Sequence, residues 1–211
     1  ERERLKQMPP FRHTVGASTM QRIRSTLRAA LNDAIAQQRF GLTINVAQHA
    51  QLPSGKRPKG LVWTAERVAE WKRTREKPSP VMVWTPEQTA AFLVHTAGDR
   101  LYALYHLMAF RGLRRGETCG LRWMDIDREA GTLTVAKQLV EHNWQVYEDD
   151  PKTEAGARTI ALDSATVEVL REHQVRQEEE RRQLGSGWTV TGRVFVAEDG
   201  AWLRPSHVTD H

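Results

Sequence analysis

The chain has 211 residues, of which 39% are hydrophobic and 27% are charged. This composition is typical of a globular protein with one large domain or two small ones. The sequence contains neither an apolar run long enough for a membrane span nor a signal-peptide pattern, so we expect no membrane partner. The single cysteine excludes an internal disulfide and a zinc site built on cysteines.

Positive charge is concentrated in the first sixty residues. They hold eleven Lys and Arg residues against three Asp and Glu, a net charge of +8, whereas the whole chain carries +5. A basic segment joined to a nearly balanced remainder indicates contact with a polyanion such as nucleic acid. A basic surface that only favours solubility is the alternative, and charge alone leaves it open.

The basic region is predicted to be largely helical. Residues 18–40 carry apolar side chains at helical spacing, with Ser18 or Thr19 as the cap and Gly41 as the stop. A loop rich in Pro, Gly and Lys follows at residues 49–60. The side chains that we assign to DNA in this region are Arg22, Arg24, Arg28, Lys56 and Arg57. The three helical arginines fit an ordinary solvated helix face equally well.

A domain boundary is predicted near residues 78–83. Residues 64–77 form an amphipathic helix capped by Thr64, and the Pro-Ser-Pro at 78–80 ends it. We therefore assign residues 1–62 to a helical DNA-binding domain, 63–82 to a helix and interdomain linker, and 83–211 to a second domain.

The second domain is predicted to be α+β, within a chain that is mixed and mainly α. Residues 84–97 form a helix with Thr85, Pro86 and Gln88 at its start, and a buried helix follows over 100–110. Period-two patterns predict a small three-stranded antiparallel sheet from 131–140, 144–148 and 157–163. A helix over 164–184 capped by Ser164, a short strand over 193–197 and the start of a last helix complete the pattern.

The stretch AFRGLRRGETCGLRW, residues 109–123, places four arginines around a predicted turn at Gly112. Arg114 and Glu117 are three positions apart and share a face of one helical turn, so the carboxylate can hold the guanidinium in one pose. A guanidinium held in this way can bind a phosphate through two hydrogen bonds. Taken alone, the spacing favours a structural ion pair. Arg115 and Arg122 are expected at the surface or near DNA, and Arg111 has no assigned role.

Lys152 lies in the polar connection between two predicted strands. It can donate a proton if it is desolvated near a phosphate, although chemistry alone favours a solvated lysine. The sequence has no glycine-rich nucleotide-binding loop, and His207 and His211 have no third partner for a metal, so we expect no cofactor and no metal. Cys119 is expected in the core.

Taken together, FRGLRRGETCGLRWMDID (110–127), the strand pattern after it and PKTEAGARTIAL (151–162) resemble the tyrosine recombinases, or phage-type integrases. The first catalytic box of that family has Gly-Leu-Arg, an acidic residue three positions on, and Leu-x-Trp-x-Asp-Ile-Asp, which stand here at 112–114, 117 and 121–127. The basic helix resembles the end of the family's core-binding domain. The details look most like integrases of actinobacterial phages and integrative elements.

The resemblance implies site-specific DNA recombination through a 3′-phosphotyrosyl intermediate, without metal or ATP. It implies that Arg114 stabilises the charge on the reacting phosphate, that Glu117 orients Arg114, and that Lys152 protonates the leaving 5′-oxygen. Arg115 becomes a candidate DNA contact. The implied partners are double-stranded attachment-site DNA, further copies of the chain in a homotetramer on that DNA, and accessory directionality or bending factors. The implied location is the bacterial cytoplasm, at the nucleoid.

We find no second catalytic box of the family, His-x-x-Arg followed by the nucleophilic tyrosine, because Tyr102, Tyr105 and Tyr147 all come too early in the sequence. We therefore expect a fragment with part of the core-binding domain and the N-terminal part of the catalytic domain, which binds DNA weakly and does not cut it alone. A non-catalytic DNA-binding or regulatory module of the same fold is the alternative. An unrelated helical DNA-binding protein is a third interpretation.

Overall fold

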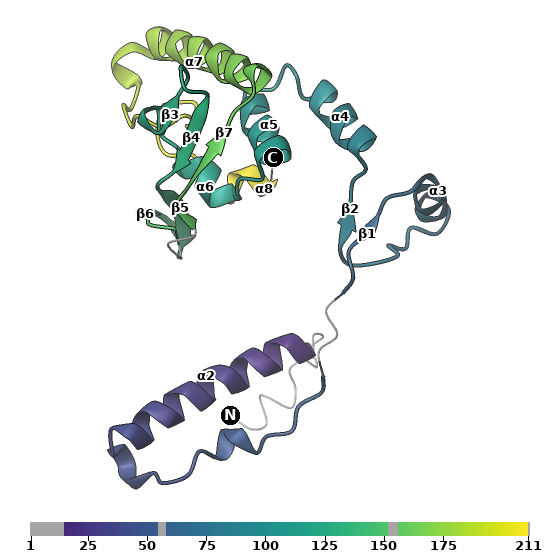
Figure 1. The fold of residues 1–211 in the computed structure, drawn as a ribbon, viewed down its shortest axis with the longest axis vertical. Helices are drawn as coiled ribbons and strands as arrows, with labels where there is room; N and C mark the ends of the chain where they lie inside the picture. The colour runs from purple at the N-terminus through teal and green to yellow at the C-terminus, as the bar shows by residue number, and fades with distance from the viewer. Residues whose placement is uncertain (1–14, 55–57, 152–155, 211) are drawn as a thin grey trace, which may run out of the picture. The chain divides into compact units, whose positions relative to one another are not determined.

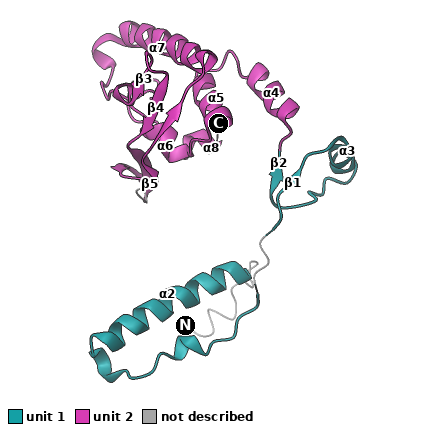
Figure 2. Cartoon of the chain, in the orientation of Figure 1, with its two compact units in different colours: residues 1–83 teal, residues 84–211 magenta. Residues whose placement is uncertain are grey.

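The computed structural model describes residues 15–54, 58–151 and 156–210 (Figure 1). The chain divides into two compact units, residues 1–83 and 84–211, which Figure 2 shows in different colours. The division falls after Val83, so the segment 63–82, predicted as a helix and linker, belongs to the first unit. The assignment of residues 1–62 to DNA binding stays a prediction.

In the first unit, the first element among the described residues is the long helix α2 (Ala17–Ala36). Its N-cap is Gly16, so Ser18 and Thr19 lie inside the helix and the predicted cap was wrong. The helix also ends earlier than predicted, because Gln38 adopts a left-handed backbone with φ 52° and starts the short turn η1 (Arg39–Gly41). A left-handed residue interrupts the helical hydrogen-bond ladder, and the apolar spacing does not reveal it.

A buried asparagine holds the following loop against α2. Asn45 precedes the short turn η2 (Val46–Gln48), and its amide donates to the carbonyl oxygen of Arg28 at 2.8 Å and to the side-chain oxygen of Asn32 at 2.6 Å. Ile23 and Leu27, which the spacing places on the inner face of the helix, are 57% and 50% exposed.

The rest of the first unit is a small β-α-β arrangement. Two short parallel strands, β1 (Leu61–Val62) and β2 (Met82–Val83), flank the helix α3 (Ala65–Thr74). The hydroxyl of Thr64 accepts a hydrogen bond from the backbone N–H of Arg67, which confirms the predicted cap. The helix ends before Lys77, because Arg75 adopts a left-handed backbone.

The second unit opens with three helices. Helix α4 (Pro86–His95) begins with the predicted capping box, in which Thr85 and Gln88 satisfy each other's backbone N–H groups. Helix α5 (Tyr102–Arg111) buries four of its side chains, and the short helix α6 (Arg115–Gly120) follows. These elements occupy the predicted places.

A three-stranded antiparallel sheet follows, but its strands differ from those predicted. Its order is β3 (Ile126–Asp127), β4 (Thr132–Val135) and β7 (Arg158–Ala161). The predicted strand 131–140 breaks after Val135, and its second half forms the separate hairpin of β5 (Gln138–His142) and β6 (Gln145–Asp149). The error was to take one continuous period-two run as one strand, when the chain changes sheets within it.

The unit ends with a long helix and irregular chain. Helix α7 (Ser164–Leu184) has the predicted length, but its cap is Asp163, whose carboxylate accepts from the backbone N–H of Thr166. The predicted strand 193–197 consists only of isolated bridges, from Arg193 and Val196. The remaining elements of this unit are η3 (Trp123–Asp125), η5 (Gly185–Gly187) and α8 (His207–Asp210).

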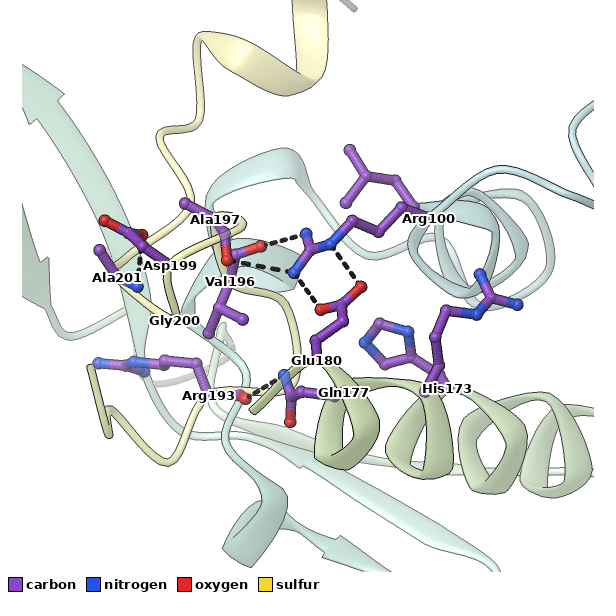
Figure 3. Close-up of polar contacts among 12 residues, drawn as sticks. Arg100, His173, Gln177, Glu180, Arg193, Val196, Ala197, Asp199, Gly200 and Ala201 are labelled. Carbon is purple, nitrogen blue, oxygen red and sulfur yellow. Dashed lines mark hydrogen bonds and ion pairs between the residues drawn. The ribbon is translucent and has the colours of Figure 1, made fainter. Parts of the chain in front are cut away.

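The core of the second unit lies between α5, α7 and the sheet. Its largest fully buried side chains include Leu104, Leu107, Leu133, Leu170 and Phe195. Arg100, just before α5, ties this core to the irregular chain (Figure 3). Its guanidinium donates to both carboxylate oxygens of Glu180 on α7, at 2.8 and 2.7 Å, and to two backbone carbonyls.

Helix α6 packs directly on the backbone of β5, and two glycines make this contact possible. Gly116 and Gly120 are four residues apart and therefore lie on one face of the helix. A Cβ atom at Gly120 would lie 2.5 Å from the Cα atom of Gln138, and one at Gly116 would lie 2.7 Å from the carbonyl oxygen of Leu139. Neither backbone atom can move aside without displacing β5.

The variant Gly120→Ala is expected to lower the free energy of unfolding by about 2 kcal/mol or more, because the new methyl group overlaps the β5 backbone. Urea unfolding followed by circular dichroism measures the loss. Gly98→Ala is the matched control, since no atom beyond its chain neighbours lies within 4 Å of the added Cβ. Equal stability of the two variants would contradict the close α6–β5 packing.

Candidate functional site

The turn between α5 and α6 directs one arginine out of the core. Gly112 ends α5 with a left-handed backbone at φ 64°, which glycine adopts without strain. The next residue, Leu113, is buried, and Arg114 then takes the extended N-cap conformation of α6. The side chain of Arg114 is 76% exposed, so its guanidinium faces solvent from a position that the backbone sets.

Glu117 is the buried counterpart of that arginine. Its side chain is 2% exposed, and it occupies the first turn of α6, where the helix dipole favours a negative charge. One carboxylate oxygen accepts from the backbone N–H of Arg114 at 2.9 Å, and the other accepts from the Arg114 guanidinium at 2.7 Å. These two bonds hold both the backbone and the side chain of Arg114.

A second arginine, Arg158 on β7, completes the cluster. Its two terminal nitrogens donate to the two oxygens of Glu117, at 2.9 and 3.1 Å, and one of them also donates to the carbonyl of Gly156 at 3.2 Å. The sequence interpretation did not assign Arg158. Period-two alternation in β7 places Arg158 on the same face as the half-buried Ile160, but it does not reveal that Glu117 is its partner.

The arginines determine the ionisation of Glu117. Burial by itself raises the pKa of a carboxyl group, but the hydrogen bonds from Arg158 and Arg114 outweigh burial and lower the pKa of Glu117 to about 2. Glu117 therefore stays a carboxylate over the whole physiological pH range. The three side chains together carry one net positive charge.

The other arginines of the turn have partners within the chain. Arg111, which had no assigned role, pairs with Asp163 and donates to the hydroxyl of Thr166 at 3.0 Å, so it joins the end of α5 to the start of α7. Arg115 donates to the hydroxyl of Thr209 on α8.

Arg122 does not stand at the surface as a free cation. Its guanidinium makes two bonds to the carboxylate of Asp125, at 2.9 and 2.8 Å, and its side chain is 25% exposed. The expected position of Arg122 at the surface or near DNA stays a prediction. The acidic residue three positions on accounts for the ion pair.

The predicted DNA-binding arginines of α2 lie in the first unit. Arg22 and Arg28 are exposed, whereas Arg24 donates to the carbonyl of Ala50 at 2.9 Å. The predicted residues Lys56, Arg57 and Lys152 lie outside the described residues. The structure brings Arg114 and Glu117 together and does not test the DNA contacts.

The described residues contain no clustered metal ligands, and their single thiol is buried. Within residues 15–54, 58–151 and 156–210, no three His, Cys, Asp or Glu side chains are grouped closely enough to hold a metal ion. Burial raises the pKa of the Cys119 thiol to about 12, so this residue is a core side chain and not a nucleophile. No helix in the same ranges is both long and apolar enough to cross a membrane.

Comparison with known proteins finds sequence relatives that are named as recombinases and integrases. The chain is 34% identical over 123 residues to the "Tyrosine recombinase XerC-like" protein of Caldanaerobacter subterraneus subsp. tengcongensis, covering 53% of this chain and 32% of that protein. It is 30% identical over 136 residues to the ICEBs1 integrase of Bacillus subtilis, covering 64% of this chain and 36% of the integrase. The matched part thus spans about a third of these relatives. No protein-family model matches the chain.

A solved structure shows the same fold. The Tn1549 transposon integrase in complex with transposon right end DNA aligns with a TM-score of 0.60 over 96% of this chain and 56% of that one, at 21% identity. The sequence relatives are named as a tyrosine recombinase and an integrase, in agreement with the resemblance seen in the sequence, and the solved integrase shows the shared fold. The affinity of the chain to actinobacterial integrases stays a prediction.

Glu117→Gln is expected to flatten the pH dependence of stability. The folded pKa of Glu117, about 2, lies below its ordinary value of 4.5, so its stabilisation is present above pH 4.5 and is lost as the pH falls towards 2. A difference of about 2.5 pKa units corresponds to at most about 3.4 kcal/mol. Urea unfolding of the wild type and of Glu117→Gln between pH 7 and pH 2.5 measures this contribution to the free energy of unfolding.

Glu168→Gln, which changes an exposed carboxylate in an i,i+3 pair with Arg171, is the control and should leave the pH dependence nearly unchanged. Curves for the wild type and Glu117→Gln that run parallel across this pH range would show that Glu117 is not a strongly stabilised carboxylate.

Proposed function

We propose that this chain forms part of the active site of a site-specific DNA recombinase, which cleaves and rejoins DNA through a 3′-phosphotyrosyl bond during integration or excision of a phage or mobile element. The observation that carries the proposal is the exposed guanidinium of Arg114, fixed from behind by the buried carboxylate of Glu117. The resemblance to the tyrosine recombinase family supports it, as do relatives named as a recombinase and an integrase.

The arrangement suits a phosphate better than a stabilising ion pair. Glu117 engages one terminal nitrogen of Arg114, and in the part of the chain that the structure describes the other N–H groups of this guanidinium have no partner. A planar fork with free N–H groups can bind two phosphate oxygens at once. Because its pose is already set, little reorganisation is needed when charge develops on the phosphate.

The remaining roles follow the family resemblance. Lys152 is proposed as the general acid that protonates the leaving 5′-oxygen. Arg115 is proposed as a DNA contact, and the basic side chains of the first unit are proposed to contact the DNA backbone: Arg22, Arg24, Arg28, Lys56 and Arg57. We further propose that the protein acts as a homotetramer on attachment-site DNA in the bacterial cytoplasm, with accessory directionality or bending factors.

Arg114→Ala tests the assignment in the protein expressed from its complete gene. With attachment-site DNA, covalent protein–DNA complexes should form at least about 100-fold more slowly, the scale of losing one preorganised charge-stabilising donor, while DNA binding changes little. Gel analysis of covalent complexes and a parallel binding titration provide the two measurements.

Arg171→Ala is the matched control, because Arg171 also pairs with a glutamate three positions away but belongs to the exposed face of α7. A protein that binds the DNA and forms no covalent complex even as wild type would favour the alternative, a non-catalytic binding module. Normal cleavage by Arg114→Ala would remove Arg114 from the mechanism.

A further inference from the structure

Glu117 is shared between two arginines, so the cluster of Arg114, Glu117 and Arg158 carries a net positive charge that can attract a phosphate. The carboxylate of Glu117 carries one negative charge and contacts the guanidinium of Arg114 at 2.7 Å. Arg114 and Glu117 alone would form a neutral pair with only a weak attraction for an anion. The guanidinium of Arg158 contributes a second positive charge on the same carboxylate.

Arg158 and Glu117 form a bidentate ion pair. Two nitrogens of one guanidinium meet two oxygens of one carboxylate, at 2.9 and 3.1 Å, which is the paired geometry that fixes both groups. Glu117 is 2% exposed, and without this partner it would be a buried carboxylate with a single exposed cation beside it. Such a group is costly, and it either shifts its pKa or moves towards water.

Arg158 also anchors the chain that precedes β7. One of its nitrogens donates to the carbonyl of Gly156 at 3.2 Å. Gly156 in turn packs against Pro151 so closely that an added Cβ would lie 2.6 Å from the Cβ of Pro151. One guanidinium therefore binds the carboxylate behind Arg114 and the end of the connection between β6 and β7.

We propose that Arg158 is a positioning residue, which neutralises the carboxylate of Glu117 and holds it through two hydrogen bonds. Glu117 can then hold the Arg114 guanidinium in place while the full positive charge of Arg114 remains available for a phosphate. This inference rests on the proposed function, because it takes Arg114 as the phosphate ligand. Arg158 acts through Glu117, with 31% of its own side chain exposed.

The competing explanation is that Arg158 only stabilises the fold. The same unit contains a matched example, the Arg100–Glu180 pair (Figure 3). There too one guanidinium grips both oxygens of a glutamate and donates to backbone carbonyls, with 25% and 26% of the two side chains exposed. Arg100→Met therefore controls for the loss of an Arg–Glu clamp away from Arg114.

The test is a titration of the 211-residue chain with inorganic phosphate, followed by NMR at the Nε–H signal of Arg114, with Arg114→Lys to assign that signal. Arg158→Met should weaken phosphate binding at Arg114 by about tenfold or more, the scale seen when an outer-shell partner of a ligating group is removed. Arg100→Met should leave the affinity unchanged even if its melting temperature falls equally.

A double variant separates charge neutralisation from stability. In a Glu117→Gln background there is no charge to neutralise, so Arg158→Met should change the affinity by less than about twofold, and the two changes should be non-additive, as expected for residues that act through one contact. Arg158→Lys keeps the charge but not the two-pronged grip, so it should retain part of the affinity. It also keeps the comparison measurable if Arg158→Met does not fold.

Three results would overturn the role of Arg158 and leave the proposed function standing. The first is an equal effect of Arg158→Met and Arg100→Met on phosphate affinity, and the second is an equally large effect of Arg158→Met in both backgrounds. The third is wild-type affinity in Arg158→Lys. An Arg114 signal that does not respond to phosphate in the wild type would overturn the phosphate assignment itself, and the role of Arg158 with it.

Discussion

The candidate site of the second unit is held together by one buried carboxylate, that of Glu117. Glu117 accepts hydrogen bonds from the backbone and guanidinium of Arg114 and from two nitrogens of Arg158, and almost none of it meets water. A buried charge is tolerated only when such partners satisfy it. The same contacts give the site its chemistry. The N–H groups of Arg114 that do not bond to Glu117 are exposed, and their direction is fixed by the bond that Arg114 makes to this carboxylate.

Backbone geometry places that carboxylate where it is needed. Gly112 turns the chain so that Leu113 enters the core and Arg114 leaves it, and Gly116 and Gly120 allow α6 to rest on the backbone of β5. The glycines in this arginine-rich stretch therefore have separate tasks, one conformational and two steric. Together they fix the place of the short helix that carries Glu117 in its first turn.

Much of this could be predicted from local patterns. The capping box at Thr85, the turn at Gly112, the short helix after it and the Arg114–Glu117 pair all depend on neighbours in sequence. The partners of Glu117 on β7, of Arg111 at the N-cap of α7 and of Arg115 on α8 are 41, 52 and 94 residues away, and no periodicity encodes such pairs. The division of residues 131–140 between two sheets was missed for the same reason, because strand pairing is a property of the whole fold.

The most direct test of this account is the ionisation of Glu117 itself. A carbon-13 NMR titration of its side-chain carboxyl in the folded chain should show no protonation between pH 8 and about pH 3.5, with an apparent pKa near 2. A midpoint near the ordinary value of 4.5 would show that the two arginines do not hold this carboxylate, and would contradict the arrangement from which the roles of Arg114 and Arg158 are inferred.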